Sequence, residues 1–150
     1  MMQIIYSLAA IIIFAPTLAL ASCLSHAAIR WNVPEIILDA IISQESNWQP
    51  NAKNNNTNGS QDYGLMQINS VNINSLKSAG IIKHKEMLMQ PCINIQAGAY
   101  LLSLKFKKYG YGWYAVGAYH SETIRHRDKY ASLIMKIVRT KADLPHQKIL

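Results

Sequence analysis

An uncharged, strongly apolar leader constrains this chain most. The first 29 residues carry no charged side chain, so all 15 Lys and Arg and all 8 Asp and Glu lie beyond them. An apolar run from Ile4 to Leu20, broken by Pro16, ends in Ala19-Leu20-Ala21. An apolar stretch followed by an A-x-A pattern is typical of a secretory signal peptide, so we expect residues 1–21 to be removed after export. A retained membrane anchor is the alternative, but the uninterrupted stretch is shorter than the roughly 20 residues that a span needs.

The two cysteines, Cys23 and Cys92, have more than one interpretation. Leu20-Ala21-Ser22-Cys23 has the pattern of a bacterial lipoprotein box, which would place a lipid on Cys23 and anchor the protein to a membrane. In an oxidising compartment the two cysteines can instead pair. Such a disulfide closes a loop of about 70 residues, worth on the order of 4 kcal/mol in the chain-entropy model. Two unrelated thiols are the remaining alternative.

Composition excludes several classes of protein. A length of 150 residues, 50% of them hydrophobic, fits one domain over residues 22–150 and excludes an intrinsically disordered chain. The five His and two Cys show no metal-ligand spacing, and no glycine-rich phosphate loop occurs, so we expect neither metal nor cofactor. The formal charge of +7 would attract an anionic polymer, or it simply keeps the protein soluble. Because the chain is expected to be exported and carries no nucleic-acid recognition motif, we expect no nucleic-acid partner. We also expect a monomer.

The pattern after the leader predicts a mainly α, α+β fold. Apolar spacing, Pro starts and Gly stops predict helices from Val33-Pro34 to about residue 48 and over 71–79, 91–109, 112–119 and 127–141. A polar stretch containing Asn58-Gly59 predicts a short β-hairpin or loop around residues 51–63, with a type I′ turn. The tail after about residue 141 is expected to fray.

Glu45 stands at an unexpected position for a carboxylate. It follows Leu38 by seven residues and Ile41 by four, so the three side chains project from nearly one helix face, the face predicted to be buried. Burial disfavours the charged form and raises the pKa of a carboxyl group. A carboxylic acid that keeps its proton near neutral pH is suited to general acid catalysis. The alternative is a Glu at a helix end that reaches solvent or caps a backbone group.

Three motifs in a fixed order give this residue a context. Glu45-Ser46 is followed by Gly64-Leu65-Met66-Gln67-Ile68-Asn69 and, about fifty residues later, by Ala118-Tyr119. In these motifs the sequence resembles the lytic transglycosylase family with its lysozyme-like SLT domain, over Cys23 to about Val138. It is most similar to the small members that accompany secretion, invasion and conjugation machines. Asp62-Tyr63, Cys23 and Pro91-Cys92 also resemble that subgroup, which favours the disulfide over lipidation and implies a periplasmic location.

The resemblance implies a lysozyme-like fold and a single general acid/base, Glu45. Glu45 would protonate the glycosidic oxygen between N-acetylmuramic acid (MurNAc) and N-acetylglucosamine (GlcNAc) in peptidoglycan. It would then accept a proton from the MurNAc 6-hydroxyl as that group closes onto C1, which leaves a 1,6-anhydro product. No water is consumed, so no second carboxylate is required. Components of a secretion, pilus or conjugation machine are the implied protein partners.

The resemblance also implies roles for the other motif residues. Ser46 would support Glu45 or the reacting sugar, and the hydroxyl of Tyr119 would lie near the catalytic acid. Gly64 permits a close backbone approach or a positive φ. Met66 and Gln67 would line the cleft, through packing on a sugar face and bonding to an N-acetyl amide. The weakest expectation is a substrate contact from Asn69.

One segment departs from the family pattern. The family tyrosine is usually continued as Tyr-Asn-Ala-Gly, whereas this chain has Tyr119-His120-Ser121-Glu122. His120 is therefore either a substituted loop residue or a group that makes substrate binding pH-dependent. Two further functions stay open at this point. The first is a hydrolytic muramidase in which Asp62 positions water, and the second is a non-catalytic subunit that binds glycan or acts as a scaffold.

Overall fold

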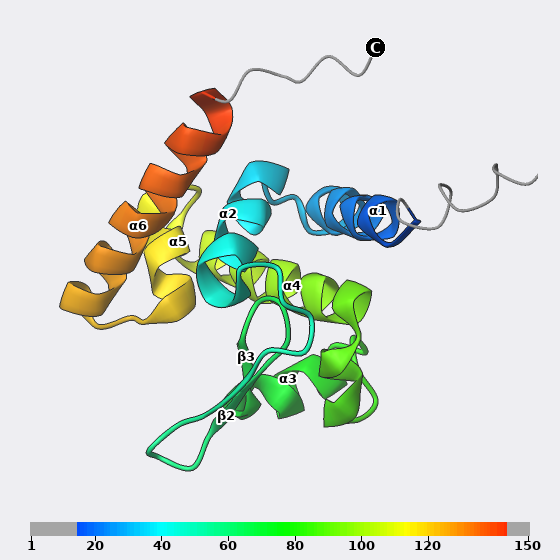
Figure 1. Cartoon of the computed structure of the whole chain (residues 1–150). Coiled ribbons are helices and arrows are strands. Elements are labelled where there is room, and N and C mark those ends of the chain that lie inside the picture. The colour runs from blue at the N-terminus through cyan, green and yellow to red at the C-terminus, as the bar shows by residue number, and fades with distance from the viewer. Residues whose placement is uncertain (1–14, 144–150) are drawn as a thin grey trace, which may run out of the picture.

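The structure is a computed structural model that describes residues 15–143 (Figure 1). These residues form six α-helices around one core and a small sheet on one side, which confirms the mainly α, lysozyme-like fold. The helices are α1 (Ala15–Trp31), α2 (Glu35–Ser46), α3 (Ile73–Ser78), α4 (Pro91–Tyr109), α5 (Trp113–His120) and α6 (Ile124–Asp143). The strands are β1 (Lys53–Asn55), β2 (Gln61–Tyr63) and β3 (Ile68–Asn69), and the 3-10 turns are η1 (Ser70–Asn72) and η2 (Lys85–Met89).

The helix ends follow from local chemistry. Helix α4 has the predicted bounds, with Pro91 in its first turn and Gly110 at φ +84° after its last residue. Pro34 has an extended backbone and precedes α2 instead of opening it, and Asn47 ends that helix in the left-handed conformation. Helix α6 extends beyond its predicted range at both ends, from 124 to 143.

Helix α1 was not predicted. It begins at Ala15 and continues through Ala21, so the expected cleavage point lies inside this helix. Its buried residues Leu24, Ala27 and Ala28 join the core. The remainder of the predicted signal peptide and the tail after Asp143 lie outside the described residues. Within residues 15–143, no helix combines the length and apolarity needed to cross a membrane.

The predicted β-hairpin is confirmed, but its turn type was wrong. Strands β1 and β2 pair antiparallel, with Lys53 opposite Tyr63, and β3 pairs with the other edge of β2. A type I′ turn needs positive φ at both central residues, and of the Asn58-Gly59 pair only Gly59 has it, at +82°. The connection is a wider loop in which the Asn56 backbone accepts from Gly59 and donates to Ser60.

The core is one cluster of buried side chains from α1, α2, α4, α5 and α6, and it fixes the end of α2. Leu38, Ile41 and Ile42 of α2 are fully buried, as are Leu102 of α4 and Ile134 of α6. Burial of each such side chain contributes about 1.5–3 kcal/mol. A disulfide between Cys23 and Cys92 joins α1 to the start of α4 and confirms the predicted pairing. The C-terminal end of α2 is thus anchored to the core.

Candidate active site

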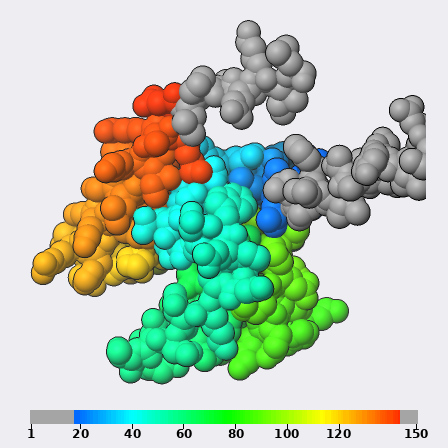
Figure 2. Space-filling view, viewed as in Figure 1, coloured from blue at the N-terminus to red at the C-terminus, as the bar shows by residue number. Residues whose placement is uncertain are grey.

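A cleft of about 1040 Å³ separates the hairpin from the α5–α6 side of the molecule. In Figure 2 the hairpin, in teal, and the α5–α6 region, in yellow and orange, project as two lobes with an open notch between them. Amide and hydroxyl side chains form most of the hairpin wall: Asn54, Asn55, Asn56, Thr57, Asn58 and Ser60. The opposite wall contains residues 118–122 and two lysines of α4, Lys105 and Lys108.

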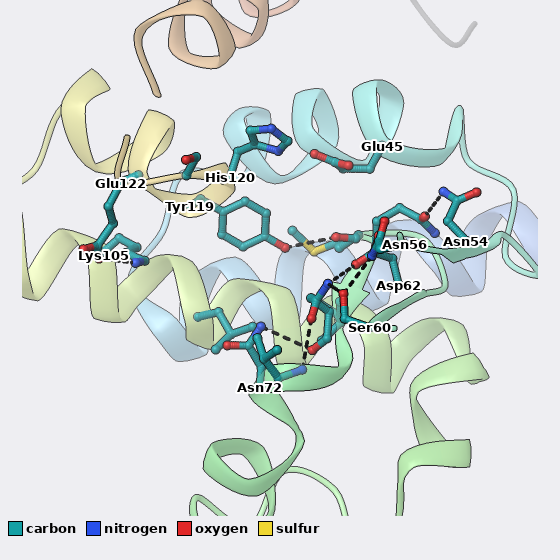
Figure 3. Close-up of a pocket in the computed structure, with 18 of the residues that line it drawn as sticks. Glu45, Asn54, Asn56, Ser60, Asp62, Asn72, Lys105, Tyr119, His120 and Glu122 are labelled. Atoms are coloured by element: carbon teal, nitrogen blue, oxygen red, sulfur yellow. Dashed lines mark hydrogen bonds and ion pairs between the residues drawn. The ribbon is translucent and has the colours of Figure 1, made fainter. Parts of the chain in front are cut away.

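Glu45 enters this cleft from the last turn of α2. Figure 3 shows its carboxylate with Tyr119 and His120 of α5 to one side and Asp62 and Asn56 of the hairpin to the other. The side chain is partly buried, because the same face of α2 that carries Leu38 and Ile41 packs into the core. The helical spacing thus brings a carboxylate to the boundary between core and cleft.

The surroundings of Glu45 favour its protonated form. Burial raises the pKa of its carboxyl group, and the negative charge of Asp62 raises it further. One contact acts in the opposite direction, because the hydroxyl of Tyr130 donates a 2.5 Å hydrogen bond to Oε1 of Glu45 and lowers the pKa. The net shift is upward. Glu45 can therefore hold a proton in the pH range in which an exposed Glu has lost it.

Residues 65–69, which follow the hairpin, form the floor of the cleft, and hydrogen bonds connect this floor to α2 and α5. Ser46 donates a 2.8 Å hydrogen bond to the carbonyl of Leu65, which links the end of α2 to this floor. The hydroxyl of Tyr119 donates to the carbonyl of Met66 at 3.1 Å, which links α5 to the floor. Burial and the charge of Glu45 raise the pKa of Tyr119 well above its usual value, so this hydroxyl stays protonated. Hydrogen bonds thus join the three sequence motifs, because Ser46 of the first and Tyr119 of the third both donate to backbone carbonyls of the second.

Asp62 is another carboxylate that lines the cleft, and both of its oxygens accept hydrogen bonds. Asn69 donates to Oδ1 at 2.7 Å and Asn56 donates to Oδ2 at 2.9 Å. Asn69 also donates to the hydroxyl of Ser60. The predicted residues Asp62 and Asn69 therefore brace the hairpin wall together.

The comparisons with known proteins agree with this arrangement. The family model described as the transglycosylase SLT domain matches residues 22–133. This chain belongs to the transglycosylase SLT domain family. The match covers the helices and strands of the site from α1 to the middle of α6.

Several named proteins are similar to this chain in sequence. Invasion protein IagB of Salmonella typhimurium is 46% identical over 105 residues, which cover 70% of this chain and 65% of that protein. This chain therefore spans just under two thirds of the length of IagB. Protein IpgF of Shigella flexneri is 41% identical over 128 residues, 82% of this chain and 83% of that protein. X polypeptide of Escherichia coli is 37% identical over 123 residues, 78% of this chain and 72% of that protein.

In the motif that begins at Gly64, the first and third residues have mainly a structural role. Gly64 has φ +68°, and a Cβ there would lie 2.4 Å from Nδ2 of Asn94, so both backbone and packing require glycine. The side chain of Met66 is fully buried, and it packs against Gly98 of α4. Met66 thus supports the floor of the cleft from below, and a sugar contact through it remains a prediction.

Gln67 lines the cleft with its amide already engaged. Its Nε2 donates to the carbonyls of Gly64, at 2.8 Å, and Ala52, at 3.3 Å, and its Oε1 accepts from Asn54 at 2.6 Å. Its backbone has φ +46°, a sparsely populated region for a residue other than glycine. The amide therefore fixes the turn to the hairpin, and a bond to an N-acetyl group would have to use the free lone pair of Oε1.

Two important residues were missed in the sequence. Asn94 is fully buried in α4, where its amide accepts from the backbone N–H of Met66 and donates to the carbonyls of Tyr63 and Leu88. Its signal was a polar residue inside an apolar helical face. Tyr130 lies within the helix predicted over 127–141, and its sequence position gives no sign that its hydroxyl meets Glu45.

The segment that departs from the family pattern closes one wall of the cleft. His120 stacks on the ring of Tyr130, with centroids 4.6 Å apart and planes 3° apart. Glu122 accepts hydrogen bonds from Lys105 at 2.7 Å and Lys108 at 3.1 Å, and these contacts lower its pKa to about 2. Among residues 15–143, no group of three or more His, Cys, Asp or Glu side chains is arranged to hold a metal ion.

Proposed function

We propose that this SLT domain protein is a peptidoglycan lytic transglycosylase, with Glu45 as its single general acid and base. The observation that supports the proposal most directly is the position of Glu45, whose carboxyl lies in the cleft with a raised pKa and a hydrogen bond from Tyr130. A general acid must hold its proton until the leaving oxygen arrives and must be oriented toward it. Burial supports the first requirement, and Tyr130 supports the second.

The reaction needs only one carboxyl group because its protons balance. Protonated Glu45 donates to the glycosidic oxygen, and the bond between C1 of MurNAc and O4 of GlcNAc breaks. The 6-hydroxyl of the same MurNAc forms a new bond to C1, and its proton passes to the Glu45 carboxylate. The products are a GlcNAc end with a free 4-hydroxyl and a 1,6-anhydroMurNAc end. Glu45 is then protonated again and ready for the next cycle.

The shape and polarity of the cleft suit an extended sugar chain. Its volume of about 1040 Å³ is at the upper limit of ordinary small-molecule pockets. Amide groups both donate and accept hydrogen bonds, as the hydroxyl and acetamido groups of a glycan require. Asn54 and Asn56 present such groups on the hairpin wall, and Asn72 does so below it (Figure 3).

We further propose that the protein acts in the periplasm after removal of residues 1–21, where it opens peptidoglycan locally for a secretion, pilus or conjugation apparatus. The apolar leader supports export. The Cys23–Cys92 disulfide supports an oxidising compartment, and it occupies the sulfur atom that lipidation at Cys23 would require. The similarity to IagB, an invasion protein, supports a role beside such a machine.

One observation favours a second candidate, a hydrolytic muramidase. Asp62 lines the same cleft and acts electrostatically on Glu45, so it could position a water for attack on C1. Each oxygen of Asp62 already accepts an amide hydrogen bond, which favours a structural role in the hairpin wall. We therefore place this candidate second.

Reaction in ¹⁸O-labelled water distinguishes the two chemistries. Purified protein is incubated with isolated peptidoglycan, and the released muropeptides are analysed by mass spectrometry. A transglycosylase releases anhydro products without label. A muramidase releases reducing products that carry one ¹⁸O. In unlabelled water these products are about 18 Da heavier than the anhydro products, because hydrolysis adds one water. Binding to peptidoglycan without release of either product would contradict both candidates and support a glycan-binding subunit.

A further inference from the structure

Tyr130 orients Glu45 but does not itself line the cleft. Its side chain is 5% exposed, and its hydroxyl points from α6 to Oε1 of Glu45 on α2. A tilt of the phenol ring would lengthen this hydrogen bond. The direction of this hydroxyl therefore depends on what covers the faces of the ring.

His120 covers one of those faces. It is the last residue of α5, and its ring lies parallel to that of Tyr130 at 4.6 Å between centroids. His120 itself lines the cleft and is exposed on that side, so its ring lies between Tyr130 and the cleft. Figure 3 shows the His120 ring and the Glu45 carboxylate on neighbouring parts of the cleft wall.

We infer that His120 is a positioning residue, whose flat ring holds Tyr130 by stacking so that the tyrosine hydroxyl keeps its hydrogen bond to Glu45. This inference rests on the proposed function for its catalytic meaning. It assigns a task to the residue that departs most clearly from the family pattern Tyr-Asn-Ala-Gly. An amide at position 120 would lack the ring that this contact uses.

The stacking task needs the ring and not the imidazole charge. Within residues 15–143, no hydrogen bond is made by either nitrogen of His120, so its contact with Tyr130 is through the ring face. Burial and the nearby His126 lower the pKa of His120, while Asp62 acts in the opposite direction. His120 therefore tends toward its neutral form, which stacks without placing a positive charge beside Glu45.

Two substitutions separate the ring from the charge. His120→Phe and His120→Leu both remove the imidazole nitrogens and keep apolar bulk in the wall, but only Phe keeps a flat ring. Because the hydrogen bond from Tyr130 lowers the pKa of Glu45, a variant that disturbs Tyr130 should titrate Glu45 at higher pH. Besides the hydrogen bond from Tyr130, the charge that acts on Glu45 is that of Asp62, and Asp62 is altered in neither variant.

The experiment is a ¹³C NMR titration of the Glu45 carboxyl in the purified chain, assigned with Glu45→Gln. We expect the His120→Leu midpoint to lie at higher pH than the His120→Phe midpoint. When each variant is combined with Tyr130→Phe, which removes the hydroxyl, the two double variants should give the same midpoint. Equal midpoints with Tyr130 present, or a difference that persists with Tyr130→Phe, would overturn the inference.

A kinetic comparison then connects positioning to the reaction. His120→Leu should lower kcat several-fold relative to His120→Phe with little change in KM, since the contact acts on Glu45 and not on sugar binding. If KM changes instead, His120 is a substrate-binding residue and the inference is wrong. If the wild type releases no anhydro product, the proposed function fails, while the NMR titration still decides the role of His120.

Discussion

The hydroxyl of Tyr130 donates a 2.5 Å hydrogen bond to Oε1 of Glu45, a residue 85 positions earlier in the chain. This contact joins α6 to the end of α2 directly beside the cleft. It also explains why α6 belongs to the site although no residue of α6 lines the cleft itself. Burial thus favours the protonated form of Glu45, and the hydrogen bond from Tyr130 orients its carboxyl group.

Tyr130→Phe tests this contact in the reaction. Removal of the donor leaves burial and Asp62 to act alone, so the pKa of Glu45 should rise and the alkaline limb of the pH–rate profile should move to higher pH. The rate at the optimum should fall about tenfold, which corresponds to a hydrogen bond of about 1.4 kcal/mol. Tyr100→Phe, in a tyrosine that packs against Trp31, is the control and should change neither quantity. An unchanged alkaline limb in Tyr130→Phe would contradict the orientation assigned to this residue.

Glu45→Gln should stabilise the folded protein at neutral pH. The pKa of Glu45 is higher in the folded than in the unfolded chain, so folding favours the protonated form. The native carboxyl therefore costs no stability below its unfolded pKa and destabilises the fold as the pH rises through its folded pKa. A neutral amide avoids this cost, and the melting temperature of Glu45→Gln should exceed that of the wild type at pH 7 but approach it at pH 4. Glu35→Gln, at the exposed start of α2, is the matched control. A variant less stable than wild type at pH 7 would contradict the assigned direction of the shift.

Asn94 is predicted to be the most sensitive polar residue of the core. Asn94→Leu keeps the volume but leaves the N–H of Met66 and the carbonyls of Tyr63 and Leu88 without their partner. An unsatisfied buried group costs about 1–3 kcal/mol, so we expect a loss of about 3–5 kcal/mol in the free energy of unfolding. Urea denaturation measures this loss, with Gln90→Leu as the exposed control near the start of the same helix. A loss below about 1 kcal/mol would show that the network around Asn94 is not needed.

The contact between α5 and α6 can be tested at one glycine. A Cβ at Gly117 would lie 2.4 Å from the backbone oxygen of Arg127, so Gly117→Ala must displace α6. We expect a loss of about 1–3 kcal/mol in stability. Activity should fall as well, because the displacement separates His120 from Tyr130. Gly112→Ala is a matched control, since a Cβ there meets nothing within 4 Å. Equal activity and stability of the two variants would contradict the importance of this contact.

Much of the helical fold was readable because its signals are local. Pro91 and Gly110 mark the ends of α4, and the spacing of Leu38, Ile41 and Glu45 identified the face of α2 that meets core and cleft. Helix α1 was not predicted because its apolar sequence resembles a leader. Its packing against α4 shows that it also contributes to the core. The hairpin turn was misjudged because pairing of Asn56 with Ser60 widened the loop beyond the two-residue Asn-Gly pattern.

The site was only partly readable because its contacts join distant segments. Glu45 and Tyr119 belong to motifs, and their order along the chain indicated a common cleft. No pattern links Tyr130 or Asn94 to those motifs, since each occupies a regular helical position and its hydrogen-bond partners lie 28 or more residues away, apart from Leu88. Met66 shows the opposite case, in which a motif residue proves to be a buried core side chain.

We propose that Glu45 alone supplies and recovers the proton in an anhydro-forming cleavage. The most direct test measures anhydromuropeptide release from isolated peptidoglycan by wild type, Glu45→Gln, Asp62→Asn and the exposed neighbour variant Gln44→Ala. We predict anhydro products from wild type and Gln44→Ala at similar rates, a loss of about 10²-fold or more in Glu45→Gln, and residual anhydro-forming activity in Asp62→Asn. Release by Glu45→Gln at the wild-type rate would contradict this role of Glu45.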